Sequence, residues 1–242
     1  MKNKSIAFLN ANTLRLLAIF FMVLDHVWGA ISGPLWMHCV GRLAFPIFAF
    51  QISEGYVHTS NVKRYAKRLF WFALAAEIPF DLLLTNTPFF PFQQNVLFTL
   101  LLGLWGISVL DKAKKNPTGK NIALAFLKAL GISLLGLVFF VDYNILGVIT
   151  VMMFYLFRDF KGARLCQLAA MCMLYIVLFE GQTIPLLGWD FPIEGFGVFA
   201  LVFIWLYNGQ KGKSSKWLQY AAYAFYPVHA LVIYFINVLR WA

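Results

Sequence analysis

Two ionisable side chains, Arg15 and His26, lie in an otherwise apolar stretch near the start of the chain, residues 13–31. Eleven positions of an α-helix make about three turns and roughly 16 Å, so both side chains fall on one face. Ionisable residues within a membrane-spanning helix are costly, face the interior of the bundle and mark functional sites. A fixed positive charge and a titratable imidazole on one face therefore predict a site that holds an extended ligand and exchanges protons.

The next apolar stretch, residues 38–57, carries Arg42, Gln51 and Glu54, all unexpected in a membrane-spanning helix. Gln51 and Glu54 are three positions apart and share a face. Pro46 lacks a backbone donor, which predicts a kink between these two side chains and Arg42. This stretch is predicted to be bent and polar on one side.

The short connection between these two stretches predicts that they are antiparallel neighbours. Glu54 is then expected near the depth of Arg15, and Arg42 near the depth of His26. Asp25 precedes His26, but its side chain points about a quarter-turn away, so adjacency alone does not make it the group that orients the imidazole. The other candidate partners of His26 are Arg42, Glu54, Asp142 and His229.

The composition places these residues in a membrane protein. Hydrophobic residues make up 61% of the chain, aromatic residues 18% and charged residues only 12%. A soluble domain of 242 residues could not bury that much apolar surface. The first stretch is too long and too charged for a cleaved signal peptide, so it is expected to be a mature helix.

Apolar stretches of near-spanning length predict an all-α, polytopic integral membrane bundle with about nine transmembrane helices, within a range of eight to ten. The stretches are residues 13–31, 38–57, 69–85, 95–110, 122–140, 145–158, 165–179, 195–208 and 218–239. No linker or repeat divides the chain, so residues 1–242 are expected to form a single domain.

The charged loops alternate along the chain, and this alternation predicts the orientation. Lys and Arg gather in the connections 58–68, 111–120, 158–164 and 208–216. The connections 85–94, 141–144 and 180–194 contain neither residue. The positive-inside rule therefore places the N-terminus and the basic loops in the cytoplasm and the C-terminus outside. The net charge of +10 is scattered through short loops, which favours contact with anionic lipid headgroups of the bilayer over nucleic-acid binding.

The sequence does not predict a disulfide framework, a metal site or a phosphate-binding loop. The three cysteines, Cys39, Cys166 and Cys172, are expected to be free thiols on different spans or at different depths. No grouping of His, Cys, Asp and Glu has the spacing of a metal site, and no glycine-rich phosphate loop is present.

The motifs around the first two stretches resemble those of the TraX family. They comprise Asp25-His26, Gly41 to Gly55, Thr59, Arg64-Tyr65, Arg68-Leu69, the run Glu77 to Asp81, Asp142-Tyr143 with Gly147, and Tyr226-Pro227 with His229. TraX proteins acetylate the N-terminus of a conjugative pilin, and they resemble a wider class of membrane acyltransferases that includes acyltransferase family 3. That class carries a basic residue, ten residues and then a catalytic histidine, a spacing that Arg15 and His26 match.

The resemblance implies a multi-pass enzyme of the bacterial plasma membrane that transfers acetyl from cytoplasmic acetyl-CoA as co-substrate, without a metal. Arg15, helped by Arg64 and Arg68, would take a phosphate of the cofactor. His26 would act as general base or accept the acetyl group transiently, with Asp25, Arg42 and Glu54 completing the catalytic site. The acceptor would be an amine or hydroxyl of a peptide, a pilin-like protein or a cell-surface glycan on the outer face, where the loop 180–194 is acidic.

Each of these residues also has a purely structural interpretation. Arg15 can extend to lipid headgroups, and His26 can hydrogen-bond across helices. Two other functions fit the sequence, a small-solute transporter with helices broken at prolines, and a non-catalytic membrane assembly factor. The sequence determines neither the acceptor nor the oligomeric state.

Overall fold

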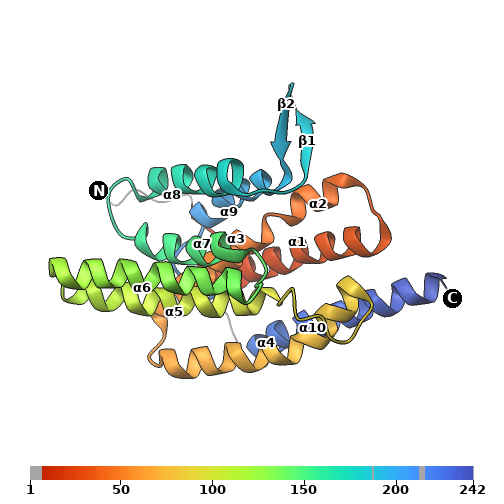
Figure 1. The fold of residues 1–242 in the computed structure, drawn as a ribbon, viewed down its shortest axis with the longest axis horizontal. Coiled ribbons are helices and arrows are strands. Elements are labelled where there is room, and N and C mark those ends of the chain that lie inside the picture. Colours follow the sequence, from red (N-terminus) through yellow and green to blue (C-terminus); the bar gives the residue numbers. More distant parts are fainter. Residues whose placement is uncertain (1–6, 187, 213–215, 242) are drawn as a thin grey trace. The chain divides into compact units, whose positions relative to one another are not determined.

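The computed structural model describes residues 7–186, 188–212 and 216–241, and most of them are helical (Figure 1). The chain divides into two compact units, Met1–Gln51 with Asp159–Ala222 and Ile52–Arg158 with Tyr223–Ala242. Helices α3 (Ala44–His58) and α10 (Lys216–Trp241) each contribute residues to both units. The expectation of a single domain stays a prediction.

The first unit is built around the N-terminal helix. Asn10 caps α1, because its side chain accepts hydrogen bonds from the backbone N–H groups of Asn12 and Thr13, both at 3.0 Å. The elements of this unit, besides parts of α3 and α10, are α1 (Ala11–Ile31), α2 (Leu35–Gly41), α8 (Ala163–Cys172), the π-helical turn η1 (Met173–Leu178), β1 (Thr183–Leu186), β2 (Trp189–Pro192), the 3-10 helix η2 (Ile193–Phe199) and α9 (Ala200–Trp205).

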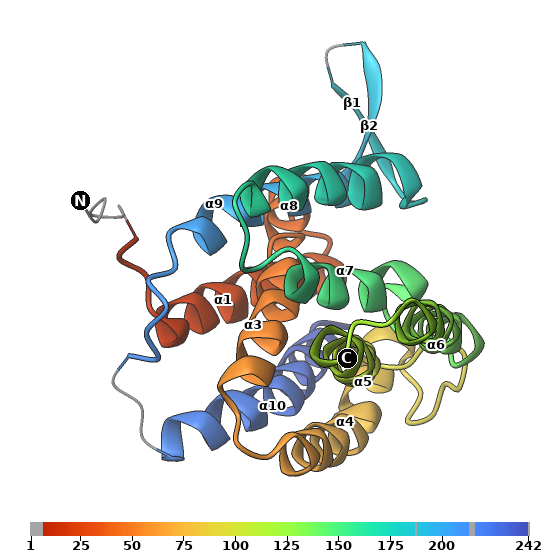
Figure 2. The ribbon, with the colours of Figure 1, turned by 90° about the vertical axis from the view of Figure 1, so that its left-hand side faces the viewer.

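The second unit packs its central helices closely. Its further elements are α4 (Val62–Thr85), α5 (Val96–Lys115), α6 (Gly119–Val138) and α7 (Asn144–Leu156). Helices α5 and α6 run side by side in Figures 1 and 2 and contact each other and α7. Gly103 and Gly106 face Val151 and Met152, where an added Cβ would collide with those side chains. Small residues at this interface let α5 and α7 approach as helices in membranes do.

Each of the nine predicted apolar stretches is helical in the structure. Within the described residues, however, five helices are long and apolar enough to cross a membrane, so nine spans are not confirmed. The five are Ala11–Ile31, Leu35–His58, Val96–Lys115, Gly119–Val138 and Tyr220–Arg240. Three other apolar helices have 10–17 residues. Their number and hydropathy identify a helical membrane protein, and the cytoplasmic N-terminus stays a prediction.

The second stretch is interrupted close to Pro46. Helix α2 ends at Gly41 and α3 begins at Ala44, so the break falls at Arg42 and Leu43. Pro46 is the third residue of α3, where its missing N–H costs nothing because the first turn of a helix has no internal partners. A proline disrupts the hydrogen bond to the carbonyl four residues earlier, here that of Arg42, so the break agrees with the predicted effect of Pro46.

The acidic connection 180–194 contains an antiparallel hairpin that the sequence did not predict. Strands β1 and β2 pair Thr183 with Pro192 and Ile184 with Phe191, and the hairpin stands away from the helices of its unit (Figures 1 and 2). Trp189 packs edge-on against Phe191 at 5.6 Å between ring centres. Tight strand pairing is local, so this segment is ordered without being buried.

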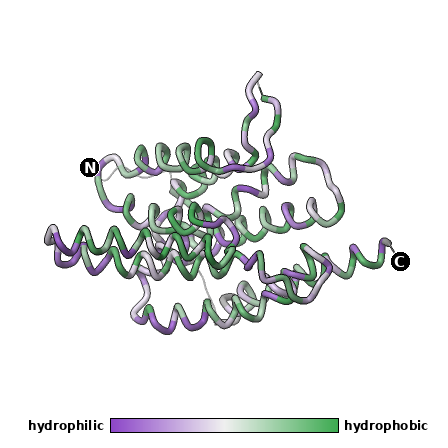
Figure 3. Tube along the Cα trace, viewed as in Figure 1, coloured by the Kyte–Doolittle hydropathy of each residue, from purple (hydrophilic) through white to green (hydrophobic). Residues whose placement is uncertain are grey.

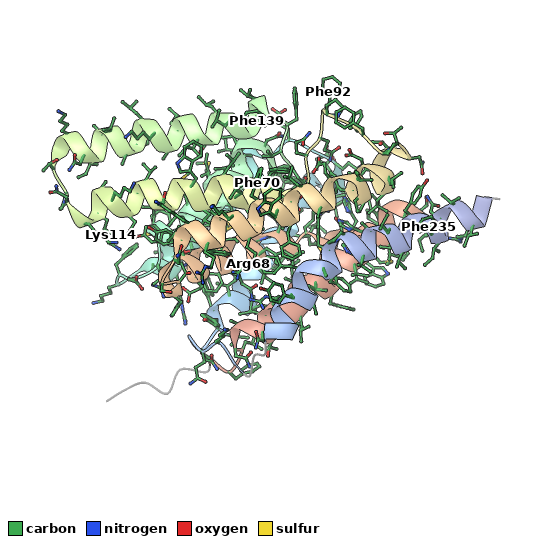
Figure 4. The ribbon with its side chains drawn as sticks, turned by 90° about the horizontal axis from the view of Figure 1, so that it is seen from below. Arg68, Phe70, Phe92, Lys114, Phe139 and Phe235 are labelled. Atoms are coloured by element: carbon green, nitrogen blue, oxygen red, sulfur yellow. The ribbon has the colours of Figure 1, made fainter. Side chains whose placement is uncertain are left out.

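The outer surface of the helices is apolar. Figure 3 shows hydrophobic residues along most of the helix lengths and hydrophilic residues gathered at their ends. The second unit exposes four phenylalanines that Figure 4 labels. The exposed fractions of Phe70, Phe92, Phe139 and Phe235 are 40%, 64%, 57% and 56%, and the figure shows their side chains on the outside. Large exposed apolar areas of this kind are suited to lipid.

Labelling of single cysteines will distinguish nine spans from five. With nine spans and a cytoplasmic N-terminus, cysteines placed at Thr87 and Gln182 face outward and one at Asn116 faces inward. With the five long helices alone, all three positions reverse, and the basic residues around Asn116 would lie outside, against the positive-inside rule.

We therefore expect an impermeant maleimide, applied to intact cells, to label cysteines at Thr87 and Gln182 but not at Asn116. All three side chains are exposed in the structure, so accessibility does not limit the reaction. The three native cysteines are first replaced by serine, and labelling after permeabilisation is the control. The reverse pattern would contradict the nine-span topology.

Candidate functional site

Four charged or polar side chains meet in the first unit and form what we term the Asp25 cluster: Asp25, His38, Arg42 and Glu194. Arg42 donates from Nη2 to Asp25 Oδ2 and from Nη1 to Glu194 Oε1, the latter at 2.8 Å. His38 Nδ1 lies 2.7 Å from Asp25 Oδ1. The four side chains are only 12–16% exposed. Buried charges must be paired and hydrogen-bonded, and here one guanidinium joins two carboxylates.

The backbone around the cluster is shaped to admit these side chains. An added Cβ at Gly41 would lie 2.5 Å from Asp25 Cβ, so α1 and α2 are in contact there because position 41 has no side chain. An added Cβ at Gly197 would meet the ring of Tyr175 and the backbone carbonyl of Arg42. Glycines at these two positions bring α1, α2 and η2 together, and that approach lets Glu194 reach Arg42.

His38 is also held on its face. The rings of Trp28 and His38 are stacked, with centres 3.8 Å apart and planes at 13°. The indole comes from α1, one turn from Asp25, so one helix supplies both the carboxylate and the stacking partner. Asp25 thus restrains the imidazole through its ring nitrogen, and Trp28 restrains it through one ring face.

Arg15 and His26 lie on α1 as predicted, and both are partly buried. Arg15 forms no ion pair with any residue in the described part of the chain. Asp25 directs both carboxylate oxygens to α2 and its C-terminal end, to His38 and Arg42. This contact confirms that the first two stretches meet at the ends next to their short connection, as predicted.

The prediction that Glu54 lies near the depth of Arg15 stays a prediction, and the partners of Glu54 in the structure are two residues that the sequence did not suggest. In the second unit its Oε1 accepts a hydrogen bond from Arg158 Nε at 2.6 Å, and its Oε2 lies 3.8 Å from His58 Nδ1. Arg158 follows the end of α7 and had been assigned to a basic loop. A short apolar helix that ends close to α3 explains this pairing, because it delivers the guanidinium to the carboxylate.

Neighbouring Asp111 forms a second saturated cluster. Tyr56 and Tyr155 donate to its two oxygens at 2.9 and 2.7 Å, and Lys115 Nζ lies at 2.7 Å. These contacts tie α3, α5 and α7 together. Three donors on one carboxylate are typical of a structural anchor.

The other predicted cofactor-binding residues lie on α4. Arg64 is exposed in the first turn, where its backbone N–H is capped by Asn61 at 2.8 Å. The guanidinium of Arg68 lies 5.5 Å from the ring centre of Tyr65 and 5.3 Å from that of Tyr223 (Figure 4). A cation over two aromatic rings is partly stabilised by them. Both arginines belong to the second unit, whereas Arg15 and His26 belong to the first.

Sequence reasoning missed three polar residues of the two units. His38 and Glu194 complete the Asp25 cluster, and Asn95 links α4 to α5 by donating to Ala73 O at 2.9 Å and to Glu77. His38 had a usable signal, because it lies four positions before Arg42 and on the same side of a helical stretch. Glu194 had none, since 152 positions separate it from Arg42.

Comparisons with known proteins find one family model and one similar protein. A family model described as TraX protein matches residues 10–237. A probable fimbrial assembly protein FimC, serogroup H1, of Dichelobacter nodosus is 30% identical over 239 residues, which covers 93% of this chain and 94% of that protein. No solved structure matches.

Replacing Gly41 with alanine is expected to destabilise the protein by about 1–3 kcal/mol, because overpacking a filled site forces its neighbours to move. The new Cβ would lie 2.8 Å from Asp25 Oδ1 and displace the carboxylate that Arg42 holds. Thermal unfolding in detergent measures the effect. Gly29, also helical, has nothing within 4 Å of an added Cβ. Gly29→Ala is the matched control, expected to be neutral or to stabilise by up to about 1 kcal/mol. Equal effects at both positions would contradict the tight contact.

Proposed function

The chain belongs to the TraX family, and from this membership we propose that it is a membrane acyltransferase. It moves an acetyl group from cytoplasmic acetyl-CoA to an amine or hydroxyl of an acceptor at the outer face of the bacterial plasma membrane. The observation that carries the proposal is the set of ionisable groups on α1. Arg15, Asp25 and His26 lie on one membrane-length apolar helix, and a helix of that kind retains such groups for function.

Arg15 is the group that binds the anionic end of acetyl-CoA. Its guanidinium is partly buried and makes no ion pair with another described residue, so it is open to a phosphate, which it can grip bidentately. Arg64 and Arg68 belong to the second unit, and their roles as further phosphate contacts stay predictions from the sequence. An extended pantetheine arm then brings the thioester toward His26, about three helical turns from Arg15.

His26 is the group that meets the thioester, as general base or as transient carrier of the acetyl group. Asp25 and Arg42 belong to the same proposed site, because they form an ion pair within the Asp25 cluster and Asp25 directly precedes His26 in the sequence. Glu54 has the narrower role of anchoring Arg158 in the second unit. The relation to acyltransferase family 3, which rests on the spacing of Arg15 and His26, stays a prediction.

A second candidate is a non-catalytic assembly factor, which the description of the Dichelobacter nodosus relative favours. That description concerns assembly of a surface fibre, and an acetyltransferase acting on a fibre subunit would also serve assembly. The two candidates differ in one respect, because only the enzyme consumes acetyl-CoA. A small-solute transporter also leaves acetyl-CoA intact.

Purified protein in sealed vesicles should hydrolyse or transfer acetyl from labelled acetyl-CoA supplied on the side of the basic loops. Arg15→Ala should weaken CoA binding by about 1.5–3 kcal/mol, or about 10- to 150-fold in Kd, through loss of a charge-assisted hydrogen bond. His26→Ala should abolish transfer and leave CoA binding intact. Isothermal titration and product analysis separate the two effects.

Lys128→Ala is the control, because Lys128 is an exposed cation within the apolar helix α6 and lies outside the proposed site. It should change neither binding nor transfer. Full activity of a folded His26→Ala protein would refute the role of His26. Absence of any acetyl-CoA turnover by the wild type, with CoA unbound, would favour the assembly factor.

A further inference from the structure

We propose that His38, oriented by Asp25, is the base that removes the proton from the acceptor, which is taken here as the primary amine that the family resemblance implies. The inference rests on the proposed acyl transfer and assigns a residue that the sequence pattern did not single out. It is carried by the contacts of His38 within the first unit. Those contacts fix which nitrogen is available, where it is held and how the captured charge is balanced.

The tautomer of His38 follows from the partners of Asp25. The paired guanidinium of Arg42 keeps Asp25 an ionised carboxylate, and an ionised carboxylate only accepts hydrogen bonds. His38 Nδ1, at 2.7 Å, must therefore be the donor. In the neutral imidazole the lone pair then lies on Nε2, on the opposite edge of the ring. A base held by a carboxylate behind it is a recurring arrangement for proton abstraction.

Trp28 fixes the same ring from another direction. The stacked indole covers one face at 3.8 Å and leaves the Nε2 edge as the reactive edge. After proton uptake, the imidazolium lies against a π-face that attracts cations. The carboxylate and the indole thus both favour the product of the proton transfer.

The charges of the cluster balance when His38 takes the proton. Asp25 and Glu194 contribute two negative charges and Arg42 contributes one positive charge. Protonation of His38 brings these four side chains to formal neutrality. In apolar surroundings an uncompensated charge is costly, so the cluster is suited to receive one proton. The same excess negative charge attracts an ammonium group, which is the resting form of an amine acceptor.

Two other histidines are held differently. His58 is 58% exposed, donates from Nδ1 to the backbone carbonyl of Glu54 at 2.9 Å and lies 3.8 Å from the carboxylate of Glu54. His229 donates from Nδ1 to the carbonyl of Phe225 at 2.9 Å. The backbone carbonyl that His229 contacts fixes that ring but brings no full charge, and at His58 the carboxylate is 3.8 Å away from a mostly exposed ring. At His38 one carboxylate, at 2.7 Å, both holds the ring and supplies the charge.

With the base assigned to His38, His26 keeps the role of acetyl carrier. His26 directly follows Asp25, the residue that holds His38, and the Cα atoms of the two consecutive residues are about 3.8 Å apart. The His26 nitrogen attacks the thioester carbon, the C–S bond breaks, and the proton lost by His26 leaves with the CoA thiolate as CoA thiol. His38 Nε2 takes one proton from the ammonium form of the acceptor, and the neutral amine nitrogen then attacks the acetyl carbon. The bond from carbon to His26 breaks, the second amine proton passes to the leaving His26 imidazole, and His38 later gives its proton to solvent.

The test compares two nucleophiles that differ in their need for a base. Glycinamide, a small mimic of a peptide amino terminus, must lose a proton to react, whereas hydroxylamine attacks acyl groups readily without such help. His38→Gln retains a donor to Asp25 but cannot take up a proton. With purified protein and labelled acetyl-CoA, and with the uncatalysed rate subtracted, we expect His38→Gln to lower transfer to glycinamide by about 100-fold or more. Transfer to hydroxylamine should fall by less than about tenfold. His26→Gln should lose both reactions.

The outcomes separate this inference from the proposed function. Equal loss of both reactions in His38→Gln would show a structural role and overturn the inference, as would retention of both. Wild-type transfer to hydroxylamine alone would overturn the assignment of an amine acceptor while acyl transfer stands. Wild-type transfer to neither nucleophile would overturn the proposed function itself, and the inference with it.

Discussion

One guanidinium determines the arrangement of the first unit. Arg42 binds Asp25 of α1 and Glu194 of η2, and it stands at the break between α2 and α3. Removing one partner of a buried ion pair typically costs about 3–5 kcal/mol, because a charge is left without compensation. The neighbouring elements lie close to this guanidinium. Helix α2 ends just before Arg42, Gly41 leaves room for the Asp25 side chain, and Gly197 lets η2 approach the backbone of Arg42. The pairing contributes less to net stability than to specificity, since it defines which segments can meet.

The same chemistry recurs in the second unit with a different result. Asp111 receives Tyr56, Tyr155 and Lys115, and Glu54 receives Arg158. The donors to these two carboxylates are tyrosine hydroxyls, an ammonium group and a guanidinium, none of which exchanges its proton readily near neutral pH. The two carboxylates connect helices. The Asp25 cluster differs because one of its donors is an imidazole, whose second nitrogen is not needed to hold the cluster. A saturated polar cluster stabilises a fold, whereas one that includes a histidine can also exchange a proton.

The sequence predicted the helices and the approach of Arg42 to the C-terminal part of α1. Apolar length identified each helix, and the short connection correctly brought Arg42 to the part of α1 that holds Asp25 and His26. Local patterns could not supply the rest. Glu194 reaches Arg42 across 152 positions, and a segment read as a loop folds into a hairpin followed by a 3-10 helix. The break at Arg42 and Leu43 lies where Pro46 cannot donate to the carbonyl of Arg42, four positions earlier. The count of nine spans is not confirmed, since α7, α8 with η1, and η2 with α9 are apolar but short.

The nature of the acceptor follows from charge more than from shape. An amine reaches the enzyme as an ammonium ion and must become neutral before it can attack an acyl carbon, whereas a hydroxyl is neutral from the start. The Asp25 cluster has one more carboxylate than guanidinium, and the segment from Glu180 to Glu194 adds Asp190 and no basic residue. Such surroundings attract a cation and then favour removal of its proton by His38. A hydroxyl acceptor would gain nothing from that excess of negative charge. Within the proposed reaction, these electrostatics favour an amine acceptor over a hydroxyl acceptor.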